Sequence, residues 1–99
     1  MSYYQAESVS KIKVQVGEVF KLESLRRPVV PRFINLIPFI VPPSGLRVMN
    51  QIRPDEEGVS YLVYELICEA PLDDKIVIGL KDMSTNVVNE QREIAVKTT

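Results

Sequence analysis

The stretch that decides the fold is residues 60–80, SYLVYELICEAPLDDKIVIGL, which holds the two most apolar strand-like runs of the chain. Residues 61–68 and 76–80 are rich in aromatic and β-branched side chains, and the turn-forming residues 71–74 separate them. This pattern predicts a central β-hairpin. Side chains alternate along a strand, so the uncharged face of the first run is assigned to the core; it comprises Leu62, Tyr64, Leu66 and Cys68.

Upstream, the sequence predicts two short strands in close succession. Apolar side chains alternate with polar ones along residues 11–16 and share one face of residues 19–23: they are Ile12, Val14, Val16, Phe20 and Leu22. Gly17 lies between the two segments and permits a sharp change of direction. We therefore expect one edge strand that is kinked or bulged at Gly17 and switches between sheets.

Residues 25–44 hold five of the seven prolines of the chain. Proline lacks the amide hydrogen and restrains the residue before it, which excludes a regular helix or a central strand here. We expect one strand between Arg32 and Val41, on a sheet edge or broken at Pro38. A turn at residues 42–45, a strand over 46–52 and a last strand over 90–97 with Ile94 and Val96 inward complete the pattern.

These segments predict an all-β fold, a seven-stranded antiparallel β-sandwich of immunoglobulin-like architecture with little or no helix. A small, partly open barrel is the main alternative. Residues 1–9 are polar and aperiodic, so we expect a flexible N-terminal tail there. Residues 10–99 are expected to form a single sandwich domain.

The residue types and motifs that the chain lacks exclude most kinds of catalytic and nucleotide-binding site. The chain has no histidine, and its one cysteine, Cys68, falls on the predicted core face, so no nucleophile with an adjacent base is expected. The four glycines are too far apart for a phosphate-binding loop. We predict a protein that is not an enzyme and binds no cofactor, metal or small-molecule substrate. One alternative stays open, a weak calcium site if the acidic turns 55–57 and 73–74 meet in space.

The net charge is −1, yet the charges are unevenly spread. Residues 1–54 carry eight Lys and Arg against three Asp and Glu, whereas residues 55–99 carry four against ten. Either strands of opposite sign pair across one sheet, or the molecule has a basic end and an acidic end. The longest apolar run, 29–41, is interrupted by Pro31, Arg32 and Pro38, so we expect no membrane contact. The N-terminus lacks the pattern of a secretion signal, and we expect a cytoplasmic protein.

The best functional candidate is the apolar, proline-rich segment 29–41. Solitary proteins rarely expose large apolar patches, so this segment is either a lid on the core or an interface. Interfaces favour aromatic and arginine side chains. We predict that residues 25–53 bind a protein partner or a second copy of the chain, as a homo-oligomer, with Phe33 and Phe39 as anchors and Arg26, Arg27 and Arg32 as rim contacts. Exposed stacking aromatics are lacking, so nucleic acid is not expected as a partner.

The order of elements from residue 16 onward resembles chagasin-type cysteine-protease inhibitors, a family of small immunoglobulin-like sandwiches. The likeness lies in strand-type segments, VGEVFKL at 16–22, VMNQIRPD at 48–55 and EIAV at 93–96. The resemblance implies the same sandwich and an alternative function, protease inhibition by loops at one end.

The inhibitory motifs of that family are absent from this chain. Residues 26–31, RRPVVP, stand where the family carries an Asn-Pro-Thr-Thr-Gly-aromatic loop. Residues 55–58 hold a single glycine where the family has a glycine-rich loop, and residues 81–84 lack its Arg-Pro-aromatic motif. The resemblance therefore assigns no binding residue to this chain.

Overall fold

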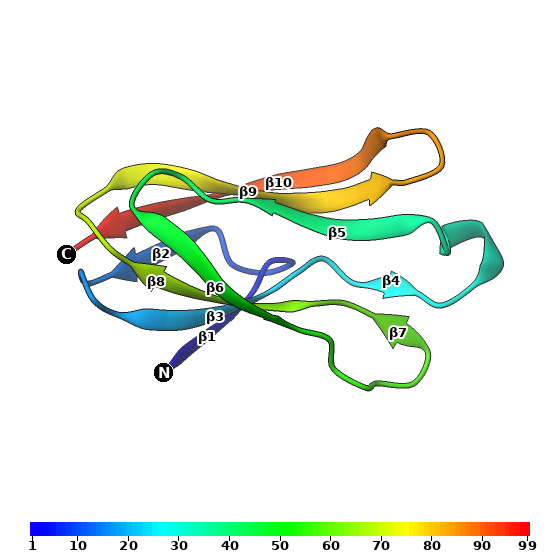
Figure 1. The fold of residues 1–99 in the computed structure, drawn as a ribbon, viewed down its shortest axis with the longest axis horizontal. Helices are drawn as coiled ribbons and strands as arrows, with labels where there is room; N and C mark the ends of the chain where they lie inside the picture. The colour runs from blue at the N-terminus through cyan, green and yellow to red at the C-terminus, as the bar shows by residue number, and fades with distance from the viewer.

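The computed structural model describes residues 1–99 as a β-sandwich with two four-stranded sheets and one short two-stranded ribbon (Figure 1). The strands in chain order are β1 (Ser2–Gln5), β2 (Lys11–Val14), β3 (Val19–Glu23), β4 (Arg27–Pro28), β5 (Leu36–Val41), β6 (Leu46–Ile52), β7 (Val59–Ser60), β8 (Val63–Cys68), β9 (Asp73–Asp82) and β10 (Val87–Thr98). The one helical element is a 3-10 turn, η1 (Pro31–Phe33). No helix of this chain has the length and apolar character that crossing a membrane requires. The all-β sandwich with little helix is confirmed, with ten strand segments in place of the seven expected.

The two sheets enclose one hydrophobic core. One sheet has the strand order β1-β3-β8-β6 and the other β2-β10-β9-β5, while β4 and β7 form the ribbon. Strand alternation sends every second side chain inward, and the predicted inward residues of β8 and β10 are buried. The core contains Ala6, Ile12, Val14, Phe20, Leu22, Leu25, Leu36, Leu46, Leu62, Tyr64, Leu66, Cys68, Ile76, Ile78, Leu80, Ile94 and Val96.

The predicted hairpin over residues 60–80 is wrong, because β8 and β9 belong to different sheets. Hydrogen bonds to other parts of the chain hold both ends of the connection between them. The backbone of Cys68 bonds to the β2–β3 turn through Gly17 and Glu18, whereas the amide of Leu72 donates to Oγ1 of Thr98 in β10. Each of the two most apolar runs thus becomes an inner strand of its own sheet, and residues 69–72 cross from one layer to the other.

The close succession of β2 and β3 is a sheet switch, as predicted. β2 pairs in parallel with β10, and β3 pairs antiparallel with β8 in the opposite sheet. Gly17 has a φ of +91°, a left-handed conformation that residues with a Cβ rarely adopt, and it makes the corner. Val16, expected to face inward, is 54% exposed because β2 already ends at Val14.

The first nine residues, expected to form a flexible tail, instead contain β1, which pairs in parallel with β3. Apolar side chains of this segment pack against the sandwich, although they follow no regular spacing in the sequence. The rings of Tyr4 and Phe20 meet edge to face with centroids 6.0 Å apart, and Ala6 is fully buried. Arg92 donates a hydrogen bond to the carbonyl of Ala6. An edge strand of four residues leaves too short a pattern for periodicity to indicate it.

The proline-rich region follows its prediction more closely. β5 is an edge strand that contains Pro38, and the turn at residues 42–45 leads into β6 in the other sheet. An edge position suits proline, because one side of the strand needs no amide donor. β6, the edge of its sheet, is irregular between Val48 and Asn50.

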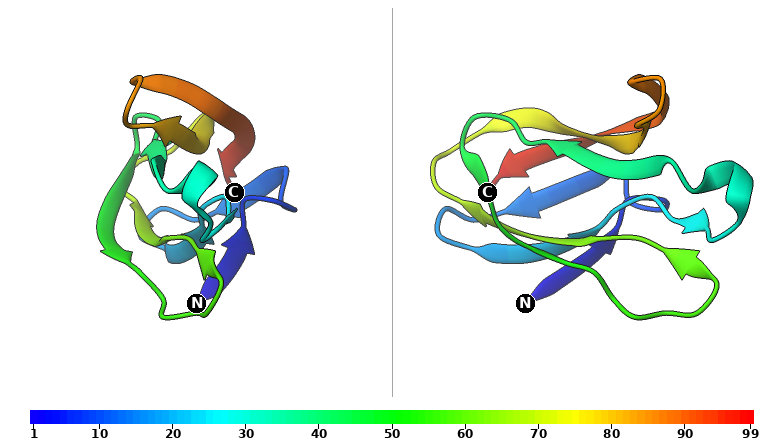
Figure 2. Two further views of the ribbon diagram at one scale, coloured as in Figure 1. Left: turned by 90° about the vertical axis from the view of Figure 1, so that its right-hand side faces the viewer. Right: turned by 45° about the vertical axis from the view of Figure 1, so that its right-hand side comes forward.

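The body is elongated, with extents of 43 × 26 × 21 Å, and its loops gather at its two ends. Residues 28–35, residues 53–58 and residues 83–86 lie together at the right-hand end of Figure 1, away from the C-terminus. Viewed onto that end in Figure 2, residues 28–35 lie between the other two segments. We call these three segments together the loop end.

Gly79 is the tightest backbone position of the fold. A Cβ at this residue would clash with the carbonyl oxygen of Glu90 and lie 2.9 Å from both Cα of Gln91 and Cε1 of Phe39. The backbone of β10 is shifted in register at this level, between Val88 and Glu90, and the ring of Phe39 covers the glycine. Both neighbours therefore occupy the space of a side chain.

We expect Gly79→Ala to lower the free energy of unfolding by about 1–3 kcal/mol, because backbone atoms must move to admit the methyl group. Urea denaturation of the variant and of Gln91→Ala, a change at the exposed partner residue, gives the comparison. Gln91→Ala should stay within about 0.5 kcal/mol of the parent. Equal stability of Gly79→Ala and the parent would contradict this close approach.

Candidate functional site

The loop end is assembled by backbone hydrogen bonds between segments far apart in sequence. The amide of Val29 donates to the carbonyl of Gly58 at 3.2 Å, next to the β4–β7 ribbon. On the other side, the amide of Met83 donates to the carbonyl of Asn35 at 2.9 Å. Residues 28–35 are thus the central segment of the loop end, with residues 53–58 on one side and residues 83–86 on the other.

Apolar side chains project from this end of the molecule. Val29 is 57% exposed, Val30 41%, Ile34 61% and Met83 59%. These four large apolar residues are thus exposed on two adjoining loops, in place of being scattered singly over the surface. Neither the core nor another strand covers them.

The β9–β10 turn is fixed by its own polar contacts. Asp82 accepts hydrogen bonds from the amide of Ser84 at 2.9 Å and from its hydroxyl at 2.6 Å. These bonds hold the pKa of Asp82 below its ordinary value. Asn86 has a φ of +61°, and its amide donates to the carbonyl of Asp82, which closes the turn. Met83 is therefore presented by a turn with a defined conformation.

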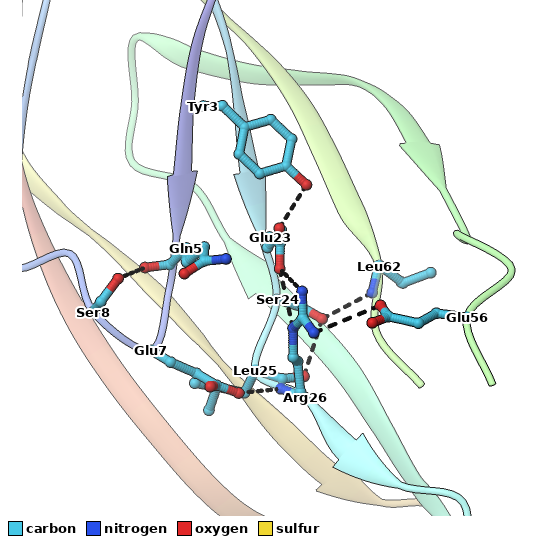
Figure 3. A network of polar contacts seen from close by, with 10 residues as sticks. All are labelled: Tyr3, Gln5, Glu7, Ser8, Glu23, Ser24, Leu25, Arg26, Glu56 and Leu62. Carbon is cyan, nitrogen blue, oxygen red and sulfur yellow. Dashed lines mark hydrogen bonds and ion pairs between the residues drawn. The ribbon is translucent and has the colours of Figure 1, made fainter. Parts of the chain in front are cut away.

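A polar network is centred on Arg26, which precedes the central segment by two residues (Figure 3). The guanidinium of Arg26 donates to Oε1 of Glu23 through Nε at 3.2 Å and through Nη2 at 2.9 Å. Its Nη1 lies 3.6 Å from a carboxylate oxygen of Glu56, and its Cζ lies 4.1 Å from the ring centroid of Tyr61. Its backbone amide donates to Oε1 of Glu7 at 2.7 Å. Arg26 therefore connects β3 with residues 53–58 and with the N-terminal segment.

Glu23 is the buried acid of this network, with 4% of the residue exposed. Besides Arg26 it binds the hydroxyl of Tyr3, which donates to Oε2 at 2.6 Å. Burial by itself would raise the pKa of Glu23, but the hydrogen bonds from Tyr3 and Arg26 and the charge of Arg26 outweigh it, so the pKa lies below the ordinary value. Desolvation, the hydrogen bond to Glu23 and the charge of Glu23 together raise the pKa of Tyr3 to about 12.

The structure brings some of the five predicted binding residues together and separates others. Arg27 donates to the carbonyl of Phe33 at 3.0 Å, and the guanidinium of exposed Arg32 lies 4.6 Å from the Phe33 ring centroid, so these three form one group around η1. Arg26 is engaged within the molecule by Glu23. Phe39 lies apart on the outer face of β5, where it covers Gly79. Half-buried Phe33 packs against the core.

The acidic turns do not meet. Residues 55–57 lie at the loop end and residues 73–74 lie near the opposite end, and no three His, Cys, Asp or Glu side chains are grouped as a metal site requires. The opposite charges of the two halves are partly paired, since Arg26 contacts Glu56 and Arg47 lies 3.1 Å from Glu69. This supports pairing between neighbouring segments over separate basic and acidic ends.

Two features of the site gave no usable signal in the sequence. Met83 belongs to a polar turn, and its role at the loop end depends on the contact with Asn35, a residue 48 positions away. The partners of Arg26 are Glu7 in the segment after β1, Glu23 in β3, Glu56 in residues 53–58, and the ring of Tyr61, so local patterning does not connect them. The alternation in β3 does place Glu23 on the face away from the core, which is the one sequence clue to an acid there.

We expect the carboxylate of Glu23 to stabilise the protein most strongly at neutral pH. Its folded pKa is lowered, so its contribution is fully present above the unfolded pKa and is lost as pH falls through the folded pKa. The variant Glu23→Gln should therefore be less stable than the parent at pH 7, with a difference that shrinks below about pH 4. Urea denaturation from pH 7 to pH 3 measures this. A stability difference that does not change with pH would contradict the assigned charge interaction.

Comparison with known proteins identifies a structural neighbour and no sequence relative. No family model matches the chain, and no curated protein matches it. The crystal structure of the cysteine protease inhibitor EhICP2 from Entamoeba histolytica superimposes with a TM-score of 0.75 at 10% identity, covering 99% of this chain and 94% of that one. At this identity the match shows the fold alone. It confirms the architectural resemblance to chagasin-type cysteine-protease inhibitors.

Proposed function

We propose that this protein is a non-enzymatic inhibitor that binds papain-type cysteine proteases through its loop end. The observation that carries the proposal is the set of exposed apolar side chains on two adjoining loops, residues 28–35 and 83–86, at one end of the sandwich. Binding of some protein partner requires only that surface. A cysteine protease as the partner is supported by the fold that this chain shares with EhICP2, a cysteine protease inhibitor.

The loop end is suited to filling a cleft. Its central segment projects Val29, Val30 and Ile34, and apolar side chains that leave water for a pocket are the usual source of affinity in such contacts. The central segment is braced by the β4–β7 ribbon on one side and by the Met83 amide on the other. Bracing of this kind lowers the entropy lost on binding.

The inhibitor proposal is in keeping with the residue types of the chain. The chain contains no histidine, and Cys68 is buried away from the loop end with its thiol directed to the carbonyl of Ala70 at 3.3 Å. A partner enzyme would therefore be blocked by occupation of its cleft. Since the loop residues differ from the inhibitory motifs of chagasin-type proteins, we expect the choice of target to depend on Val29, Val30 and Ile34.

Self-association is the second candidate function, and the edge strand β6 supports it. Met49 is 45% exposed and Ile52 is 39% exposed on this strand, within the region 25–53 predicted to bind a partner. The irregular register at Met49 opposes simple strand addition, because a bulged edge pairs poorly with a second strand. This makes the loop end the stronger candidate.

An inhibition assay with a matched pair of variants tests the proposal. Val29→Asp places a charge on the apolar surface of the loop end, and Val16→Asp places the same charge at the opposite end, on a residue of similar exposure. We expect the parent to inhibit a papain-type protease, Val29→Asp to raise the inhibition constant at least about tenfold, equivalent to about 1.4 kcal/mol, and Val16→Asp to have no effect.

Absence of inhibition and of complex formation across a panel of papain-type proteases would overturn the proposed function. A stable dimer in light scattering that Met49→Asp dissociates would favour self-association instead. Equal loss of inhibition in both aspartate variants would show that the charge acts through stability, and urea denaturation of both variants checks that.

A further inference from the structure

We propose that residues 1–9 act as a latch that sets the position of residues 53–58 and thereby controls the loop end. The latch runs from Tyr3 and Glu7 to Arg26, and from Arg26 to Glu56. The conformational part of this inference stands on the structure. Its effect on partner binding rests on the proposed function.

The first connection joins β1 to Glu23. β1 is an edge strand with one neighbour, β3, and Tyr3 lies opposite Lys21 in their parallel register. The Tyr3 hydroxyl reaches past this register to Oε2 of Glu23 at 2.6 Å, although half of the residue is exposed. The other carboxylate oxygen of Glu23 is then free to hold Arg26.

The second connection joins the N-terminal segment directly to the start of the central loops. Oε1 of Glu7 accepts the amide hydrogen of Arg26, one residue before β4 begins. A hydrogen bond from a backbone amide to an ionised carboxylate is about twice as strong as a neutral one. Residues 1–9 thus fix the backbone of Arg26 through Glu7 and its side chain through Tyr3 and Glu23.

The third connection reaches residues 53–58. The guanidinium of Arg26 lies 3.6 Å from Glu56 and over the ring of Tyr61. The other contacts of this loop with the central segment are the two residue pairs of the β4–β7 ribbon and the Val29 to Gly58 hydrogen bond of 3.2 Å. The position of Arg26 therefore contributes, together with these contacts, to the position of the loop.

The latch can open while the sandwich stays folded. Its two contacts with residues 1–9 are hydrogen bonds made by the exposed side chains of Tyr3 and Glu7. The sandwich itself is held together by many fully buried aliphatic side chains in the core. Loss of these two side-chain contacts frees Arg26 from residues 1–9, while β1 keeps its pairing with β3 and Ala6 keeps its place in the core.

Hydrogen exchange tests the conformational part. The double variant Tyr3→Phe with Glu7→Ala removes both latch contacts, and Ser8→Ala is the control, since the hydroxyl of Ser8 bonds only within the same segment, to Gln5. We expect the Val29 amide of the double variant to exchange at least tenfold faster, while the amides of Met83 and Cys68 keep their rates. An unchanged rate at Val29, or an equal acceleration of all three amides, would overturn the latch.

The binding assay tests the control of the loop end and separates the two proposals. With a protease that the parent inhibits, the double variant should have a higher inhibition constant and Ser8→Ala an unchanged one. Faster exchange at Val29 with an unchanged inhibition constant would overturn the control of binding. If the parent inhibits no protease, the proposed function fails, and hydrogen exchange still decides whether the latch exists.

Discussion

Contact between the inner faces of the two sheets is the interaction on which the rest of the structure depends. The inward side chains of β8 and those of β9 are buried in one core because the two strands lie in opposite layers. A hairpin would have placed these two apolar runs side by side in one sheet. The other sheet would then have been built from strands with fewer apolar residues. With one run in each layer, each sheet has an apolar inner strand with neighbours on both sides, and the connections must cross between layers at the ends.

These crossings determine where the loop end lies. The chain leaves one sheet after β3 and enters the other at β5, and the residues between them form the ribbon strand β4, the turn η1 and the exposed valines. One backbone hydrogen bond joins these residues to residues 53–58 and another joins them to the β9–β10 turn. The Arg26 network then joins the same region to β1. Apolar contacts thus maintain the sandwich, and polar contacts of smaller energy position its loop end.

The sequence predicted the layers better than their connections. Period-two alternation identified the inward residues of β2, β3, β8 and β10, and proline chemistry placed β5 on an edge. Alternation does not tell which sheet a strand joins, and that choice is made by distant bonds such as Leu72 to Thr98, so the hairpin prediction failed. The apolar segment around Val29 could be identified because it is one run of the sequence. Met83 and Glu23 could not, because the residues around them come from other parts of the chain.

The most direct test of the account is a nuclear magnetic resonance titration of the ¹⁵N-labelled protein with an inactivated papain-type protease, followed residue by residue. The account predicts that chemical-shift changes and line broadening concentrate in residues 28–35, 53–58 and 83–86, with the opposite end around Val16 unaffected. Changes centred on β6 or on the outer face of β5, or a spectrum that does not respond at all, would contradict it.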